Sequence, residues 1–207
     1  GAEPERLRKM IDLWWAEAGR NGVLPLDDHS AKRRRPIQSP GDEHETLTYR
    51  FSPPIAHIPR VLSPSLGQGQ WSLTADVEVS RNDSEGMIYS QGSNRDGFAL
   101  FLQDETLNLV YTSLYETTTG RSSRTLPRDR TTVGLMFERV GDQAGTITFT
   151  VDGEEAGVMK IPNATRAARM RGVDIGRTSL EPITDQFDAP FRFTGRIRSV
   201  TIQTRPK

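Results

Sequence analysis

The sequence predicts an all-β protein, an antiparallel two-sheet β-sandwich preceded by one N-terminal amphipathic helix. Three observations support this class. Apart from a short possible helix at residues 164–170, apolar residues recur at helical spacing only within the first twenty positions. From residue 47 onward, short segments of alternating or continuous apolar residues follow one another, separated by turn residues. Strands and helices do not alternate along the chain, so a parallel sheet with crossover helices is excluded.

The helix is predicted over residues 4–20. Its apolar positions follow the i, i+3, i+4, i+7, i+8 and i+11 spacing of one helix face; they are Leu7, Met10, Ile11, Trp14, Trp15 and Ala18. Pro4 suits the first turn, and the Asn21-Gly22 pair supplies residues that tolerate the left-handed conformation at a helix end. The segment that follows is polar, rich in proline and without periodicity, and it includes the basic run 32–35. We expect a linker at residues 29–46, between a helix and exit segment (1–28) and a sandwich domain (47–207).

Strand signals dominate the rest of the chain. Residues 71–79 alternate between apolar and polar, as in a strand with one buried and one solvated face. The segments 86–91, 97–103 and 106–113 are more continuously apolar, which is typical of strands in the middle of a two-layer fold. Asp152-Gly153 lies between two strand-like segments and predicts a tight hairpin. The apolar phase changes near Ser199, so the last segment is expected to form either a pair of strands or one long bulged strand. About ten such strands fit a jelly roll of the concanavalin and laminin-G type.

Composition limits the partners. The 207 residues include 27 Lys and Arg and 27 Asp and Glu, a net charge of zero, so no summed positive field attracts nucleic acid. No apolar run is long enough to span a membrane, and the first residues lack the pattern of a signal peptide. The absence of cysteine excludes disulfides and thiolate chemistry. The compartment stays open between the cytoplasm and export to the periplasm or the medium.

Catalytic patterns are missing. The three histidines, His29, His44 and His57, precede the main strand region, and no G-x-S-x-G motif surrounds a serine. Asp76 and Glu78 share one face of a strand, but alternating charges on a solvated sheet face explain them without a glycosidase pair. We therefore expect no catalytic residue and no bound cofactor in this chain.

Two binding sites are considered. Asp174, Asp185 and Asp188, with Glu181 between them, could ligate calcium from a loop at the sandwich edge, although their spacing is irregular and an ordinary acidic loop is the alternative. Phe98, Phe101, Tyr111 and Tyr115 could form a platform for stacking sugars. Most of these aromatic residues occupy inward-facing strand positions, which favours core packing.

Several motifs together resemble the C-terminal part of bacterial arylsulfatases of the alkaline-phosphatase superfamily. They are L-W-W-A-E-A at 13–18, G-V-L-P-L-D-D at 22–28, V-D-G at 151–153, D-I-G-R at 174–177 and A-P-F-R-F-T-G at 189–195. The resemblance covers nearly the whole chain. It implies that residues 1–28 finish a catalytic domain and that the rest is a laminin-G-like sandwich packed against it.

The same resemblance implies that the chemistry lies outside this chain. Sulfatases convert the Cys or Ser of a C/S-x-P-x-R motif to formylglycine and bind a divalent cation. The resemblance implies that the cation of the parent protein is calcium. The motif is absent here, and D-A-P-F-R at 188–192 has aspartate at the modified position. We expect a non-catalytic accessory domain that docks on the sulfatase catalytic domain through Leu7, Met10, Ile11, Trp14, Trp15, Leu24 and Leu26. Without that domain, the Trp-bearing face is expected to pack on the sandwich or on a second copy. The alternative is an independent, lectin-like module that binds a glycan.

Overall fold

The computed structural model describes residues 3–20, 46–53, 55, 57–66, 69–80, 84–164, 172–178 and 183–205. The chain divides into two units, Gly1–Pro40 and Gly41–Lys207. Three parts of the chain lie outside the described residues: the basic run 32–35, residues 24 and 26, and residues 165–170 of the possible short helix at 164–170.

In the first unit, helix α1 spans Pro4–Arg20, which confirms the predicted helix. Glu5 in its first turn and Arg20 in its last turn complement the helix dipole. Arg20 also donates a hydrogen bond to Glu17, with Nη1 2.6 Å from Oε1. No helix in the described part of the chain is long and apolar enough to cross a membrane.

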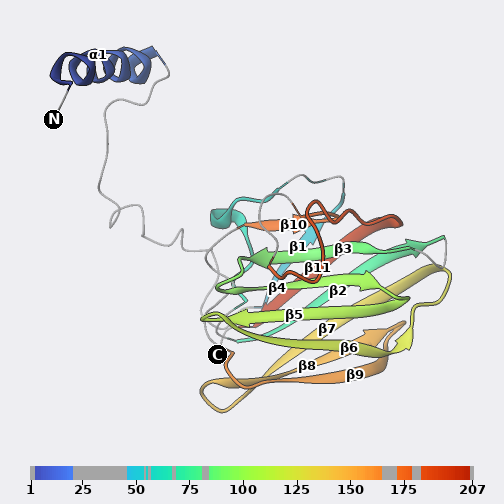
Figure 1. Cartoon of the computed structure of the whole chain (residues 1–207). Coiled ribbons are helices and arrows are strands. Elements are labelled where there is room, and N and C mark those ends of the chain that lie inside the picture. Colours follow the sequence, from blue (N-terminus) through green and yellow to red (C-terminus); the bar gives the residue numbers. More distant parts are fainter. Residues whose placement is uncertain are drawn as a thin grey trace. The chain divides into compact units, whose positions relative to one another are not determined.

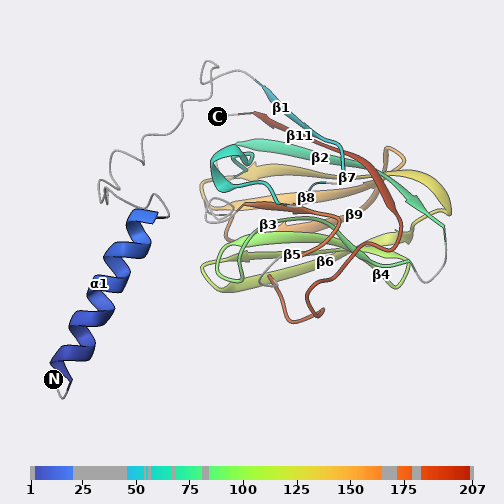
Figure 2. The same cartoon turned by 90° about the horizontal axis from the view of Figure 1, so that it is seen from above.

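The second unit is a sandwich of two antiparallel sheets, seen as stacked layers in Figures 1 and 2. One sheet has six strands in the order β1-β11-β2-β7-β8-β9, and the other has five in the order β10-β3-β4-β5-β6. The strands are β1 Leu47–Phe51, β2 Gln70–Val79, β3 Gly86–Gly92, β4 Gly97–Gln103, β5 Thr106–Ser113, β6 Glu116–Thr125, β7 Asp129–Val140, β8 Ala144–Val151, β9 Glu154–Ile161, β10 Val173–Ile175 and β11 Arg196–Arg205. A single 3₁₀ turn, η1 Arg60–Leu62, is described between β1 and β2.

The main core lies between the two sheets. Trp71 of β2 stacks between Phe98 of the opposite sheet and Phe137 of β7, with ring centroids 5.3 and 5.5 Å away. The indole is 4% exposed, so nearly its whole apolar surface is removed from water. The alternation predicted for 71–79 is confirmed, because Trp71, Leu73 and Ala75 face this core while the residues between them face outward.

A second, smaller core covers the outer face of the five-stranded sheet. Phe101 packs there against Phe187 and Phe191 from the segment before β11, which crosses this face (Figure 2). The ring centroids of Phe187 and Phe191 are 4.8 Å apart. This covering segment explains why β3, β4 and β5 are apolar on both faces: each lies between two hydrophobic layers.

Local turn chemistry also agrees with the sequence. The predicted hairpin joins β8 to β9 through Asp152 and Gly153, at φ 51° and 82°. The register of β11 against β2 shifts between Ile197 and Ser199, which confirms the expected bulge. The sequence did not indicate β6 as a strand, because its Thr, Ser and Arg side chains show no apolar alternation; β6 pairs with β5 at the sheet edge.

Candidate functional site

His57, the last of the three histidines, has a specific partner. The Nδ1 atom of His57 lies 2.7 Å from Oδ1 of Asp174 on β10. The other side of the ring abuts the chain at Gly172, where an added Cβ would lie 2.6 Å from Nε2. The pair therefore ties the segment after β1 to the sheet edge, beside the bridge between Ile58 and Val173. A pairing across 117 positions has no signal in the sequence.

The calcium candidates occupy different surroundings. Asp174 is engaged with His57, whereas Asp185 and Asp188 are exposed in the segment that covers the five-stranded sheet. Within the described ranges, no three histidine or acidic side chains gather closely enough to hold a metal ion. Glu181 lies outside the described residues, and calcium binding stays a prediction.

The four aromatic candidates separate into core and surface. Phe98 and Phe101 are fully buried, and Tyr111 is 7% exposed. Burial raises the pKa of Tyr111 to about 12. Core packing is therefore confirmed for these three residues, while Tyr115 is 70% exposed at the β5–β6 turn.

The exposed Tyr115 belongs to a strained hairpin tip. Leu114 and Tyr115 have φ values of 50° and 69°, a conformation that Asn and Gly adopt more easily. The guanidinium of Arg95 lies 5.5 Å from the Tyr115 ring centroid, and Asp96 accepts a 2.9 Å hydrogen bond from the Leu114 amide. The tip presents one aromatic ring and one cation to solvent, and Arg95 covers part of the ring.

The outer face of the six-stranded sheet carries ion pairs. Arg130 donates to both carboxylate oxygens of Asp76, at 3.0 and 2.7 Å. Arg198 donates from Nε to Glu78 at 2.6 Å. The hydrogen bond from Arg130 is the largest effect that holds the pKa of Asp76 below its ordinary value. This confirms that Asp76 and Glu78 belong to a solvated charged face.

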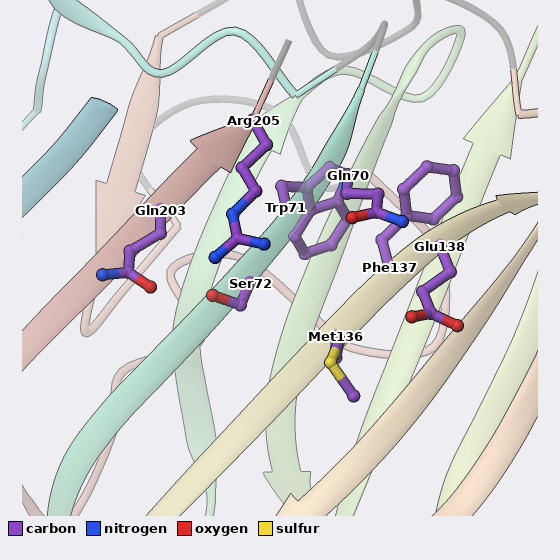
Figure 3. A pocket seen from close by; sticks show the side chains of 8 residues that line it. All are labelled: Gln70, Trp71, Ser72, Met136, Phe137, Glu138, Gln203 and Arg205. Atoms are coloured by element: carbon purple, nitrogen blue, oxygen red, sulfur yellow. The ribbon is translucent and has the colours of Figure 1, made fainter. Parts of the chain in front are cut away.

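A shallow hollow lies at one end of the same face (Figure 3). Its side chains come from three neighbouring strands, with Gln203 opposite Ser72 and Ser72 opposite Met136 in the register. Arg205 and Gln70 form the next pair. The hollow measures about 230 Å³ and mixes amide, hydroxyl, thioether and charged groups.

A larger groove lies at the edge of the sandwich, near the ends of β10 and the start of β11. It measures about 390 Å³, within the range typical of ligand pockets. Two arginines, Arg177 and Arg192, line it together with an apolar wall made of Pro53, Ile55, Ile175, Phe193 and Ile197. We call it the arginine groove. In the described part of the chain, neither guanidinium forms a hydrogen bond or an ion pair.

Sequence reasoning did not identify the arginine groove as a site. Arg177 and Arg192 appeared only within motifs of the family resemblance, fifteen positions apart in irregular segments. No periodicity relates such residues, so only the folded chain brings them to one groove.

Five of the residues predicted for docking lie on helix α1. Leu7, Met10 and Ile11 are 60%, 62% and 46% exposed, and Trp14 and Trp15 are 45% and 52% exposed. The two indoles contact each other edge to face, with centroids 4.8 Å apart. Leu24 and Leu26 lie outside the described residues. Docking through this face stays a prediction.

The fold and the groove define the class of protein: a two-sheet sandwich of the laminin-G and concanavalin type with an open groove at its edge. No family model and no curated protein matches the sequence. Among solved structures, the CBM40 domain of Ruminococcus gnavus IT-sialidase, bound to α2,3 sialyllactose, is 13% identical; the match covers 75% of this chain and 90% of that one, with a TM-score of 0.52.

Two further solved structures have similar folds. For the NanB sialidase of Streptococcus pneumoniae, the identity is 10%, the match covers 77% of this chain and 26% of that one, and the TM-score is 0.51. For domains LG4-5 of the mouse laminin α1 chain, the corresponding values are 16%, 73%, 40% and 0.48. The similarity of the two sialidase structures confirms the predicted sandwich fold. None of these three is a sulfatase, so the sulfatase resemblance stays a prediction.

Proposed function

We propose that the chain is a non-catalytic, lectin-like module that binds a saccharide in the arginine groove. The observation that carries this proposal is the pairing of an apolar wall with guanidinium donors that have no described partner. A sugar has the complementary surface, because its C–H groups pack on apolar side chains while its oxygens accept hydrogen bonds. Arg177 and Arg192 each offer five N–H donors in a fixed plane.

The fold supports the same function. A sandwich of this architecture occurs in the Ruminococcus gnavus module that is bound to sialyllactose. At 13% identity that protein supplies a precedent for the fold and no correspondence of residues. The choice of groove therefore rests on the residues of this chain alone.

The described side chains also favour binding over catalysis. His57 is held by Asp174 on one side, and its Nε2 faces the backbone of Gly172 on the other. Among the described residues, the hydrogen bond of this ring is to a carboxylate and not to a hydroxyl nucleophile. The acidic residues Asp76 and Glu78 are occupied by arginines rather than directed into a cleft. Neither the arginine groove nor the hollow on the six-stranded sheet contains two carboxylates, as a glycosidase centre requires.

A glycan array tests the proposal. We expect saturable binding of the labelled chain to at least one printed saccharide, and loss of that binding in Arg192→Ala. Tyr115→Ala is the matched control, because it removes an exposed polar-tipped side chain from the β5–β6 turn and should leave binding unchanged. No binding to any saccharide contradicts the proposal. If Tyr115→Ala loses saccharide binding and Arg192→Ala retains it, the binding site is at the hairpin tip instead.

The exposed helix face favours a second function, an accessory role in a sulfatase. Two exposed tryptophans beside Leu7, Met10 and Ile11 form an apolar surface of the kind that usually contacts a partner. In this proposal the partner is the catalytic domain implied by the sequence resemblance. Adding the purified chain to a sulfatase truncated before the equivalent helix should restore aryl-sulfate turnover, and Trp14→Ser/Trp15→Ser should abolish the rescue. Absence of rescue by the unaltered chain contradicts this role.

A further inference from the structure

The two arginines of the groove lie on two segments that are joined by hydrogen bonds. The amide of Phe193 donates to the carbonyl of Gly176 at 3.0 Å, and the amide of Phe191 donates to Oγ1 of Thr178 at 3.0 Å. These two bonds lie on either side of Arg177 and Arg192, and they place the two residues opposite each other. Residues directly opposite in antiparallel segments have neighbouring side chains.

The segment that carries Arg192 is held firmly on its other side as well. The amide of Met87 donates to the carbonyl of Phe191 at 3.2 Å, and the amide of Thr194 donates to the carbonyl of Glu85 at 2.8 Å. Gly86 lies so close that a Cβ there would be 2.1 Å from the carbonyl oxygen of Arg192. The backbone that positions this arginine is therefore fixed before any ligand arrives, which lowers the entropy cost of binding.

Like charges at directly opposite positions are destabilising unless an opposite charge compensates them. Elsewhere in the described sandwich, arginines form ion pairs with carboxylates, as Arg130 does with Asp76 and Arg124 does with Glu154. Arg177 and Arg192 have no such partner among the described residues. A bound anion would supply the partner that both guanidinium groups lack among the described residues.

The wall of the groove narrows the choice of anion. Ile55, Ile175 and Phe193 line the same space as the guanidinium groups and exclude water from one side of it. A bare inorganic ion contacts the arginines but not this apolar wall. A ligand that carries an anionic group on a ring with C–H faces contacts both the arginines and the apolar wall.

We propose that the arginine groove recognises an acidic saccharide, with the carboxylate or sulfate oxygens held between Arg177 and Arg192 and the sugar ring against Phe193. This inference rests on the proposed glycan-binding function and specifies its ligand class. A planar guanidinium donates two parallel hydrogen bonds to either type of oxyanion, which a lysine cannot do.

The test is a ¹H–¹⁵N NMR titration of the full chain with inorganic sulfate, glucuronic acid, glucose 6-sulfate and glucose, at constant ionic strength. We expect saturable shifts of the Arg177 and Arg192 Nε–H signals with all three anions. Glucuronic acid or glucose 6-sulfate should bind at least about tenfold more tightly than glucose, a difference of about 1.4 kcal/mol, because an oxyanion pairs with the guanidinium charges and accepts two parallel hydrogen bonds from one guanidinium, which a neutral hydroxyl does not. The two acidic sugars separate carboxylate from sulfate recognition.

Single substitutions locate the effect. Arg177→Gln and Arg192→Gln should each weaken binding of the acidic sugars at least about fivefold, and Arg192→Lys should restore only part of the loss because it keeps the charge without the planar fork. Arg121→Gln is the matched control, because it removes an exposed arginine from β6 at the opposite edge of the five-stranded sheet. Urea midpoints of all variants establish that they are folded.

The outcomes separate this inference from the function on which it rests. Equal affinity for glucose and the acidic sugars overturns the acidic ligand class and leaves glycan binding intact. Equal weakening in Arg121→Gln overturns the arginine groove as the binding site. Saturable binding of sulfate with no binding of any saccharide on the array overturns both, because the groove is then only an anion site.

Discussion

Replacing Phe187 with alanine removes the ring that joins the outer face of the five-stranded sheet to the segment carrying Arg192. Phe187 is 8% exposed, and its ring centroid lies 5.1 Å from Phe101 and 4.8 Å from Phe191. Truncation of a buried phenylalanine costs about 3–5 kcal/mol. We expect about 3 kcal/mol, the lower limit, because this second core is thin and its covering segment can partly close the space.

Urea unfolding followed by circular dichroism measures this cost. With an m-value of about 2 kcal/mol/M, a loss of about 3 kcal/mol lowers the midpoint by about 1.5 M. Phe187→Leu keeps most of the apolar volume and should cost under about 1.5 kcal/mol. Leu62→Ala removes a side chain that is 63% exposed and should change stability by less than about 0.5 kcal/mol. A Phe187→Ala midpoint within about 0.3 M of the unaltered chain would show that the ring does not form a core.

Three other substitutions test separate parts of the structure. Gly86→Ala forces a Cβ against the carbonyl oxygen of Arg192 at φ 121° and should cost more than about 2 kcal/mol by urea unfolding. Gly153→Ala, at φ 82° with no atom within 4 Å of the new Cβ, should cost only about 1 kcal/mol; equal costs would contradict the close approach at Gly86. Asp76→Asn should lower stability by about 0.5 kcal/mol at neutral pH, because it breaks a largely solvent-screened ion pair with Arg130.

The effect of Asp76→Asn should depend on pH. Since Arg130 lowers the pKa of Asp76, the folded state binds its proton less readily than the unfolded chain. The stabilisation is complete above the ordinary carboxyl pKa of 3.8 and is lost as the pH falls through the lowered value. Urea midpoints of the two proteins should therefore converge on acidification. A difference that persists in acid identifies a packing effect instead of an ionic one.

The sequence predicted the sandwich well because its signals are local. A strand with one solvated face alternates, as from Trp71 to Val79, and a two-residue hairpin needs residues that accept positive φ, as at Asp152 and Gly153. The bulge near Ser199 was visible as a change of apolar phase. Strand β6 was not predicted, because an edge strand of threonine, serine and arginine shows no apolar alternation.

The candidate site could not be predicted in the same way. Arg177 and Arg192 lie in irregular segments, which are joined by hydrogen bonds from the Phe191 amide to the Thr178 hydroxyl and from the Phe193 amide to the Gly176 carbonyl. The acidic loop considered for calcium also contributes Phe187 to a second core, a role that its three neighbouring carboxylates obscured. The contact between His57 and Asp174 likewise depends on the pairing of β10 with the sheet edge.

The most direct measurement of the central claim is a map of backbone amide shifts during titration with the acidic sugar that binds best. Glycan binding in the arginine groove predicts the largest changes at residues 175–177 and 191–195, with little change on the outer face of the six-stranded sheet. Changes centred on Ser72, Met136 and Gln203 would place the ligand in the hollow of Figure 3 and contradict the account.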